Sequence, residues 1–168
     1  TITGSYNNRD PHENGDNTNA GTDAGDIFGP LAARIVDLRA TTEMDSAHWY
    51  NTITFDHLDP GKAYIITLSA NRDKIEYAGA RFTRVTIAGA ETYTNASSPG
   101  VVVNSEASVS FSTGYNKVNG YVAKWTGVTS GADSSFSVTS VWDTTQGSGL
   151  QNTKGYAMSG FCLEQAGS

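Results

Sequence analysis

Histidines and carboxylates are the residues of this chain that could do catalytic chemistry, and their spacing matches none of the usual catalytic motifs. The three histidines, His12, His48 and His57, stand far apart, and His12-Glu13 lacks the second histidine of a zinc-binding His-Glu-x-x-His motif. The stretch "YAMSGF" has Ala157 where a nucleophile elbow needs its first glycine. We also find no glycine-rich loop before a Lys-Ser or Lys-Thr pair. The motifs therefore predict no catalytic centre.

Paired carboxylates need a separate assessment, because two carboxyl groups suffice for a glycosidase. The candidate pairs beside predicted turns are Asp56 with Asp59, Glu43 with Asp45, and Asp73 with Glu76. Acidic residues beside turns ordinarily cap backbone N–H groups, so we interpret these six as turn residues. A small sandwich enzyme, either a glycosidase or a polysaccharide lyase, remains an alternative. It requires two carboxylates, or a tyrosine with an arginine or histidine, in one groove.

Aromatic side chains provide a clearer indication of binding chemistry, since the chain has three tryptophans and eight tyrosines. A sugar ring has a face of C–H groups that packs on a flat aromatic ring, while Asn, Asp and Arg bind its hydroxyls. Trp125 and Tyr64 are in phase with apolar strand residues, which predicts that they lie in the core. Rings in loops or at strand ends are the stacking candidates, namely Trp49, Tyr50, Tyr77, Tyr115 and Trp142.

Polar side chains follow a well-defined strand in "LDPGKAYIITLSANRD", residues 58–73. Arg72 is a planar donor fork and Asp73 is an acceptor, so together they could grip sugar hydroxyls or an acidic sugar. The alternative is an ion pair with Glu76 or Arg81 that fixes the loop. The predicted polar ligand-binding residues are Asn71, Arg72, Asp73 and Asn116.

Residues 1–30 are rich in Asn, Asp and Gly and have few apolar side chains. Such a segment cannot bury enough surface to form its own core, so we expect a long loop that wraps the domain or is held by an ion. Hard oxygen ligands for a structural calcium ion are available, although the closing glutamate of an EF-hand is missing. A solvated loop is the alternative. The candidate calcium ligands are Asp16, Asn19, Asp23 and Asp26.

From residue 31 the pattern changes to short alternating stretches separated by turn signals such as Asp-Pro-Gly at 59–61. In "AARIVDLRATT", Val36 and Leu38 alternate with Asp37 and Arg39, which favours a strand, although a helix is an alternative. Eight or nine such strands predict an all-β fold, an antiparallel β-sandwich of the jelly-roll type. We expect one domain over 1–168, with its sandwich core within 31–165.

Charge and hydropathy limit the partners. The net charge is −6 and the basic residues are scattered, which argues against nucleic acid. No apolar run approaches the roughly 20 residues of a membrane helix. Cys162 is the only cysteine, so an internal disulfide is excluded. The polar composition favours a secreted protein, and a start at Thr1 suggests a mature or excised segment.

Four stretches, at 58–73, 80–97, 120–140 and 154–164, are similar to a module often appended to secreted bacterial proteins. That module has a Pro-led strand ending near an arginine, a strand with Arg-x-Thr, a Gly-Ala-Asp turn before Ser-Phe-Ser-Val, and a last strand ending in Leu-Glu. Ser134 stands where its turn usually has glycine. The resemblance covers residues 50–165 and implies a jelly-roll carbohydrate-binding or accessory domain of polysaccharide-degrading enzymes. It implies no set of ligand residues.

These observations predict a non-catalytic carbohydrate-binding module. We expect it to be monomeric and attached to a catalytic domain, which it would hold near a polysaccharide or oligosaccharide. A structural or adhesive domain of a cell-surface protein is the main alternative. That alternative predicts that the loop aromatics are packed away and that a partner protein binds.

Overall fold

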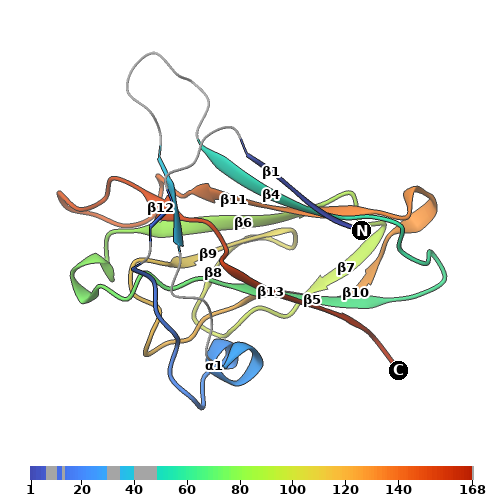
Figure 1. The fold of residues 1–168 in the computed structure, drawn as a ribbon, viewed down its shortest axis with the longest axis horizontal. Coiled ribbons are helices and arrows are strands. Elements are labelled where there is room, and N and C mark those ends of the chain that lie inside the picture. Colours follow the sequence, from blue (N-terminus) through green and yellow to red (C-terminus); the bar gives the residue numbers. More distant parts are fainter. Residues whose placement is uncertain (7–10, 13, 30–34, 40–48, 168) are drawn as a thin grey trace.

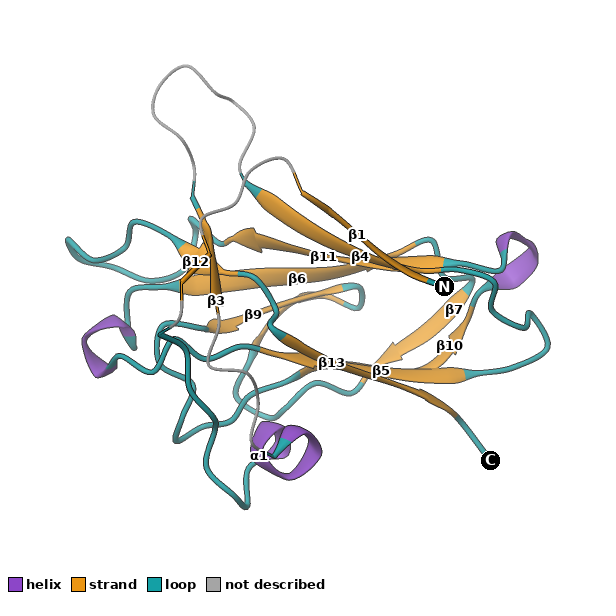
Figure 2. Ribbon diagram, viewed as in Figure 1, coloured by secondary structure: helices purple, strands orange, loops and turns teal. Residues whose placement is uncertain are grey.

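Two antiparallel β-sheets form most of the molecule (Figures 1 and 2). The computed structural model describes residues 1–168 except 7–10, 13, 30–34, 40–48 and 168. The first sheet has the order β1 (Ile2–Tyr6), β4 (Tyr50–Phe55), β11 (Phe136–Trp142), β6 (Phe82–Ala88), β9 (Ser108–Ser112) and β8 (Val102–Ser105). The second has the order β13 (Gly160–Gln165), β5 (Tyr64–Ser69), β10 (Ala123–Thr129) and β7 (Thr92–Asn95). The predicted all-β antiparallel sandwich is confirmed.

The chain alternates between the two sheets, as a jelly roll requires. Strands β4, β5, β6 and β7 lie in the first, second, first and second sheet in turn. Strands β9, β10 and β11 then continue the alternation, and β11 returns to lie between β4 and β6. Most neighbours within a sheet are therefore far apart in sequence, apart from the hairpin of β8 and β9, and loops gather at the two ends of the sandwich (Figure 2).

The core between the sheets is built from the inward residues of alternating strands. Trp125 of β10 is fully buried, and Phe55 stacks on Phe136 with ring centroids 5.1 Å apart. Tyr64 is also buried, so the predicted core positions of Trp125 and Tyr64 are confirmed. Burying a large apolar side chain contributes about 1.5–3 kcal/mol, so these rings stabilise the fold and are unavailable to a ligand.

A small third sheet, made of β12 (Gly155–Tyr156), β3 (Ile35–Leu38) and β2 (Pro11–His12), lies at one end of the sandwich (Figure 1). The predicted strand at β3 is present, but Asp37 is only 1 % exposed. Its carboxylate pairs with Lys154 and, at 2.9 Å, with Arg39. These two cations compensate the buried charge of Asp37. The alternation in the sequence had predicted that Asp37 lies on the opposite face of the strand from Leu38.

Two parts of residues 1–30 are regular, in contrast to the predicted loop. Strand β1 pairs with β4 along its whole length. Residues 23–28 form the short helix α1 (Asp23–Phe28), whose N-terminus is capped by the Thr22 hydroxyl accepting from the Gly25 amide at 3.1 Å. Residues 14–19 have no regular structure. No helix in the described ranges is both long and apolar enough to cross a bilayer.

The turn before β11 has a left-handed residue at Ser134, which follows the short 3-10 helix η2 (Gly131–Asp133). Its φ of 53° lies in the region where glycine is favoured.

Candidate binding site

A polar cavity of about 190 Å³ lies beside the small third sheet, at one loop end of the sandwich. Residues from six separate parts of the chain line it, namely Asn14, Asp37, Arg72, Tyr77, Arg81, Lys154 and Tyr156. The volume is below the roughly 300–1,000 Å³ of pockets for drug-sized ligands. The cavity is therefore small and suits only a small ligand or one end of a larger one.

Charge is unevenly distributed between this cavity and the rest of the protein. Arg72, Arg81 and Lys154 face a single lining carboxylate, Asp37, so the described lining has a surplus of two positive charges. The whole chain has a net charge of −6. A cation-rich hollow in an acidic protein creates a local potential that attracts anions.

Arg81 is the most deeply placed arginine of the cavity, with 7 % of its surface exposed. Its Nε donates to the Gln151 carbonyl at 3.0 Å, Nη1 donates to the Tyr156 hydroxyl, and Nη2 makes a long contact of 3.4 Å with Gln151 Oε1. Its guanidinium carbon lies 3.4 Å from the centre of the Tyr77 ring. All of these partners are neutral groups.

Arg72 lines the cavity from the loop that follows β5. Its Nη1 donates to the Asn14 carbonyl at 2.9 Å, and its guanidinium carbon is 6.0 Å from the Tyr77 ring centre. Asp73 does not pair with Arg72 but with Lys117, at 3.3 Å. Arg72 and Asp73, which were predicted to bind a sugar together, therefore have separate partners. Among the residues described here, Arg72 forms no ion pair.

Tyr77 ends the 3-10 helix η1 (Ile75–Tyr77) and is half-buried. Burial opposes ionisation, but the hydrogen bond from Lys74 and the charges of Arg81 and Arg72 together lower the pKa of Tyr77. Burial raises the pKa of Tyr156, and this outweighs the hydrogen bond from Arg81. The cavity thus has one phenol that is easier to ionise and one that stays protonated.

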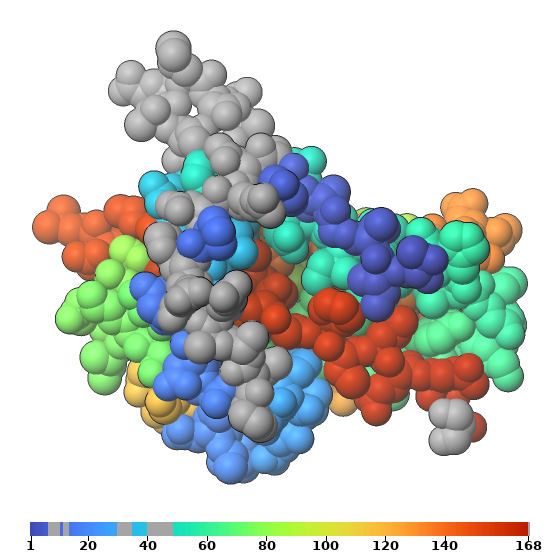
Figure 3. Space-filling model, in the orientation of Figure 1, coloured from blue at the N-terminus to red at the C-terminus, as the bar shows by residue number. Residues whose placement is uncertain are grey.

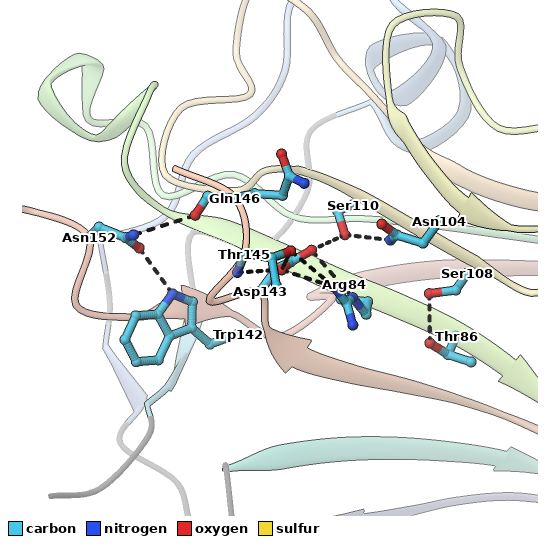
Figure 4. Close-up of polar contacts among 10 residues, drawn as sticks. All are labelled: Arg84, Thr86, Asn104, Ser108, Ser110, Trp142, Asp143, Thr145, Gln146 and Asn152. Atoms are coloured by element: carbon cyan, nitrogen blue, oxygen red, sulfur yellow. Dashed lines mark hydrogen bonds and ion pairs between the residues drawn. The ribbon is translucent and has the colours of Figure 1, made fainter. Parts of the chain in front are cut away.

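The loop from Asp143 to Lys154 contributes Lys154 to the cavity lining, and Asp143 holds the loop to strands of the first sheet through Arg84 and Ser110 (Figure 4). The buried Asp143 carboxylate accepts hydrogen bonds from Ser110, from the Thr145 hydroxyl at 2.6 Å, and from Arg84 Nη2 at 3.1 Å. Burial raises the pKa of Asp143, but these hydrogen bonds and the charge of Arg84 lower it overall. Its oxygens are fully engaged, which indicates a structural role.

Trp142 and the tip of this loop make further contacts that hold the loop in place. The Trp142 indole donates to Asn152 Oδ1 at 3.2 Å, and the Ser148 amide donates to the Gly79 carbonyl at 3.0 Å. A Cβ at Gly147 would lie 2.4 Å from the Ala80 carbonyl oxygen, so only glycine permits this approach. The two loops consequently lie side by side in the space-filling view, one in green and one in orange-red (Figure 3).

The remaining predicted sugar-binding residues lie outside the cavity lining. Asn71 and Asn116 are buried, and Asn116 donates to the carbonyls of Ala70 at 3.2 Å and Tyr121 at 3.0 Å, so both asparagines organise loops. Trp49 is buried beneath Arg39, whose guanidinium carbon is 5.3 Å from its ring centre. The side chains that are half-buried away from the cavity are Tyr50, Tyr115 and Trp142.

The predicted calcium ligands have separate partners. Asp16 pairs with Lys117 at 3.0 Å, Asp23 accepts from Ser98 at 2.6 Å, and Asp26 accepts from an amide at 2.7 Å. Across the described ranges, no three His, Cys, Asp or Glu side chains gather as a metal site would require. Calcium binding, with Asn19 as a further ligand, stays a prediction. His48 and the carboxylates Glu43 and Asp45 lie outside the described residues.

Sequence reasoning identified only Arg72 and Tyr77 among the cavity residues, and it considered Arg81 solely as an ion-pair partner. A usable signal was present, because Arg81 is in strand phase with Thr83 and Val85, which are both buried. An arginine on the core-facing side of a strand is a candidate for a functional role. Lys154 and Asn14 gave no comparable signal.

No protein-family model, curated protein or solved structure matches this chain in the comparisons.

Proposed function

We propose that this chain is a non-catalytic carbohydrate-binding module that binds a saccharide in the cavity at the loop end of the jelly roll. The observation that carries the proposal is the meeting of a half-buried tyrosine ring with several fixed donors in one small hollow. Loops on a rigid sandwich are a common place for such sites. We further propose that the module is secreted and tethered to a polysaccharide-degrading enzyme, whose local substrate concentration it raises.

The mode of binding follows from the shape and lining of the cavity. Arg81 occupies one face of the Tyr77 ring and fixes its orientation, so less conformational entropy is lost when a ligand binds. Arg72 and Lys154 supply charged donors for ring hydroxyls. A cavity of about 190 Å³ favours recognition of one unit or a chain end over a long stretch of polymer.

Affinity electrophoresis and calorimetry against a panel of neutral and acidic polysaccharides and their oligosaccharides test this function. We expect binding to at least one glycan class, with Tyr77→Ala weakening it at least tenfold. Tyr115→Ala is the matched control, because Tyr115 is also half-buried but does not line the cavity. The absence of binding to every glycan, or an equal loss in both variants, would contradict the proposal.

A polysaccharide lyase is the second candidate, favoured by the tyrosine–arginine pairing in the cavity. A lyase needs a base that removes the proton next to a sugar carboxylate and a cation that stabilises the resulting charge. Tyr77, with its lowered pKa beside Arg81 and Arg72, has the chemistry of such a base. Ultraviolet absorbance of an unsaturated product during incubation with a uronic-acid polymer would support this candidate. Binding without product would support the binding module.

A further inference from the structure

We infer that the cavity is an anion site, in which the negative group of an acidic saccharide sits against the guanidinium groups of Arg81 and Arg72. The saccharide part of this inference rests on the proposed function, whereas the anion part rests on the charges of the cavity alone.

Arg81 carries the first step, because a buried cation is costly unless an opposite charge compensates it. Arg81 is only 7 % exposed, and no carboxylate of the described residues forms an ion pair with it. A guanidinium has five N–H donors. Three have the partners given above, so one N–H on each of Nη1 and Nη2 is available for a further acceptor.

The carboxylate of the cavity does not compensate Arg81, because it is engaged elsewhere. Asp37 forms ion pairs with both Lys154 and Arg39. Its negative charge is therefore shared with cations other than Arg81, and an incoming anion beside the Arg81 guanidinium would lower the electrostatic energy.

Arg72 supplies the second cation of the cavity. It is half-exposed, its one hydrogen bond goes to the neutral Asn14 carbonyl, and it flanks the same Tyr77 ring as Arg81. Two guanidinium groups around one ring present fork-shaped donors that match the paired oxygens of a carboxylate or a sulfate ester. The protonated Tyr156 hydroxyl, which accepts from Arg81, retains its own proton for donation.

The chemical class of the ligand follows from these groups. A sugar unit with a carboxylate or sulfate fits a small cavity that has a cation surplus, a tyrosine ring and hydroxyl-binding donors. The acidic remainder of the protein repels a polyanion. This repulsion favours contact through one end or one unit, since an extended acidic chain would also meet the negative surface.

Calorimetry with three oligosaccharides of equal length, one of uronic acids, one sulfated and one neutral, tests the inference and separates its two anion sources. We expect at least one acidic oligosaccharide to bind at least tenfold more tightly than the neutral one, with an affinity that falls as salt rises. Arg72→Gln should weaken that binding at least tenfold. Lys62→Gln is the matched control, because it removes the same charge at an exposed position outside the cavity. Thermal unfolding verifies that both variants fold.

Inorganic sulfate alone, followed by thermal unfolding, separates the inference from the proposed function. Stabilisation by sulfate that Arg72→Gln abolishes, without binding to any glycan, would support the anion site and contradict carbohydrate binding. Equal binding of neutral and acidic oligosaccharides, unaffected by Arg72→Gln, would overturn the anion site and leave the carbohydrate-binding function standing. If neither sulfate nor any acidic oligosaccharide has an effect, the anion site is wrong.

Discussion

Arg81 and Arg84 lie three residues apart, one just before β6 and one within it. Arg84 pairs with a carboxylate, whereas Arg81 contacts neutral groups. Arg84 is 36 % exposed and donates to the buried Asp143 carboxylate at 3.1 Å. Arg81 is far more buried, and its partners are a phenol, a carbonyl and an amide oxygen. The more exposed arginine thus has the carboxylate, and the more buried one does not.

For the proposed anion site, this difference separates a structural arginine, Arg84, from the arginine assigned to binding, Arg81. The Arg84–Asp143 pair has complementary charges and saturated hydrogen bonds, and it fixes the loop that contributes Lys154 to the cavity lining (Figure 4). The surroundings of Arg81 leave its charge uncompensated, which costs stability in the free protein. A protein retains such a cost at a site where a ligand supplies the missing charge.

The largest effect is expected at Asp143. The substitution Asp143→Ala removes the carboxylate that accepts hydrogen bonds from Arg84, Ser110 and Thr145. The buried Ser110 hydroxyl then loses this acceptor. We expect a loss of about 2–3 kcal/mol in the free energy of unfolding, measured by urea denaturation. A loss below about 0.5 kcal/mol would show that this network does not hold the loop.

The two arginines can be compared directly with the same substitution. Arg84→Met leaves the Asp143 carboxylate buried without its cation, so we expect a loss of about 1–2 kcal/mol. Arg81→Met removes an uncompensated buried charge and keeps an apolar stem against Tyr77, so the loss should be below about 1 kcal/mol. Urea denaturation of both variants without added anions gives the comparison. A larger loss for Arg81→Met would mean that the free protein does compensate Arg81.

Acid should weaken the Arg84 region in a predictable direction. The folded-state pKa of Asp143 is lowered, so its contribution is fully present above the unfolded pKa of about 3.9 and is lost as the pH falls through the folded value. The free energy of unfolding of the parent should therefore fall more steeply below pH 4 than that of Asp143→Asn. Parallel curves for the two proteins would contradict the role assigned to this carboxylate.

The smallest effect is expected at Lys117. Unlike Arg81 and Arg84, this cation pairs with two carboxylates in a position that solvent reaches. It pairs with Asp16 at 3.0 Å and Asp73 at 3.3 Å, and its side chain is 37 % exposed. Screening limits such pairs to about 0–1 kcal/mol each, so Lys117→Gln should cost less than about 1 kcal/mol. A loss as large as that of Asp143→Ala would show that this pair is a main anchor of residues 14–19.

The sandwich could be predicted because the residue pattern that indicates each strand or turn lies within a few consecutive positions. The alternation in β5, β6, β10 and β11 identified core residues such as Trp125, and glycine-containing turns separated the strands. The strand at β1 was not predicted, because β1 is exposed and has no alternating apolar face. It is ordered through its pairing with β4, a partner that is some 50 residues away in the chain.

The candidate site was predictable only in part. Arg72 and Tyr77 were identified because both lie near the end of β5, where polar residues interrupt an apolar pattern. Asn71 and Asn116 have the same residue types as sugar-binding side chains, but they are buried and bond to nearby backbone groups. Polar type alone does not distinguish a ligand-binding amide from one that organises a loop, since both need the same hydrogen bonds.

Residue types within a few positions of one another were enough to predict most strands of the sandwich, the turns between them and the burial of Trp125 and Tyr64. Which cations meet in the cavity depends instead on the three-dimensional arrangement of the strands. Arg72 and Arg81 are nine residues apart, but Lys154 comes from a distant part of the chain, and long-range strand pairing brings it to the same cavity while a carboxylate is placed beside Arg84 instead. Pairing across the sheets sets these neighbours, and no local pattern encodes them.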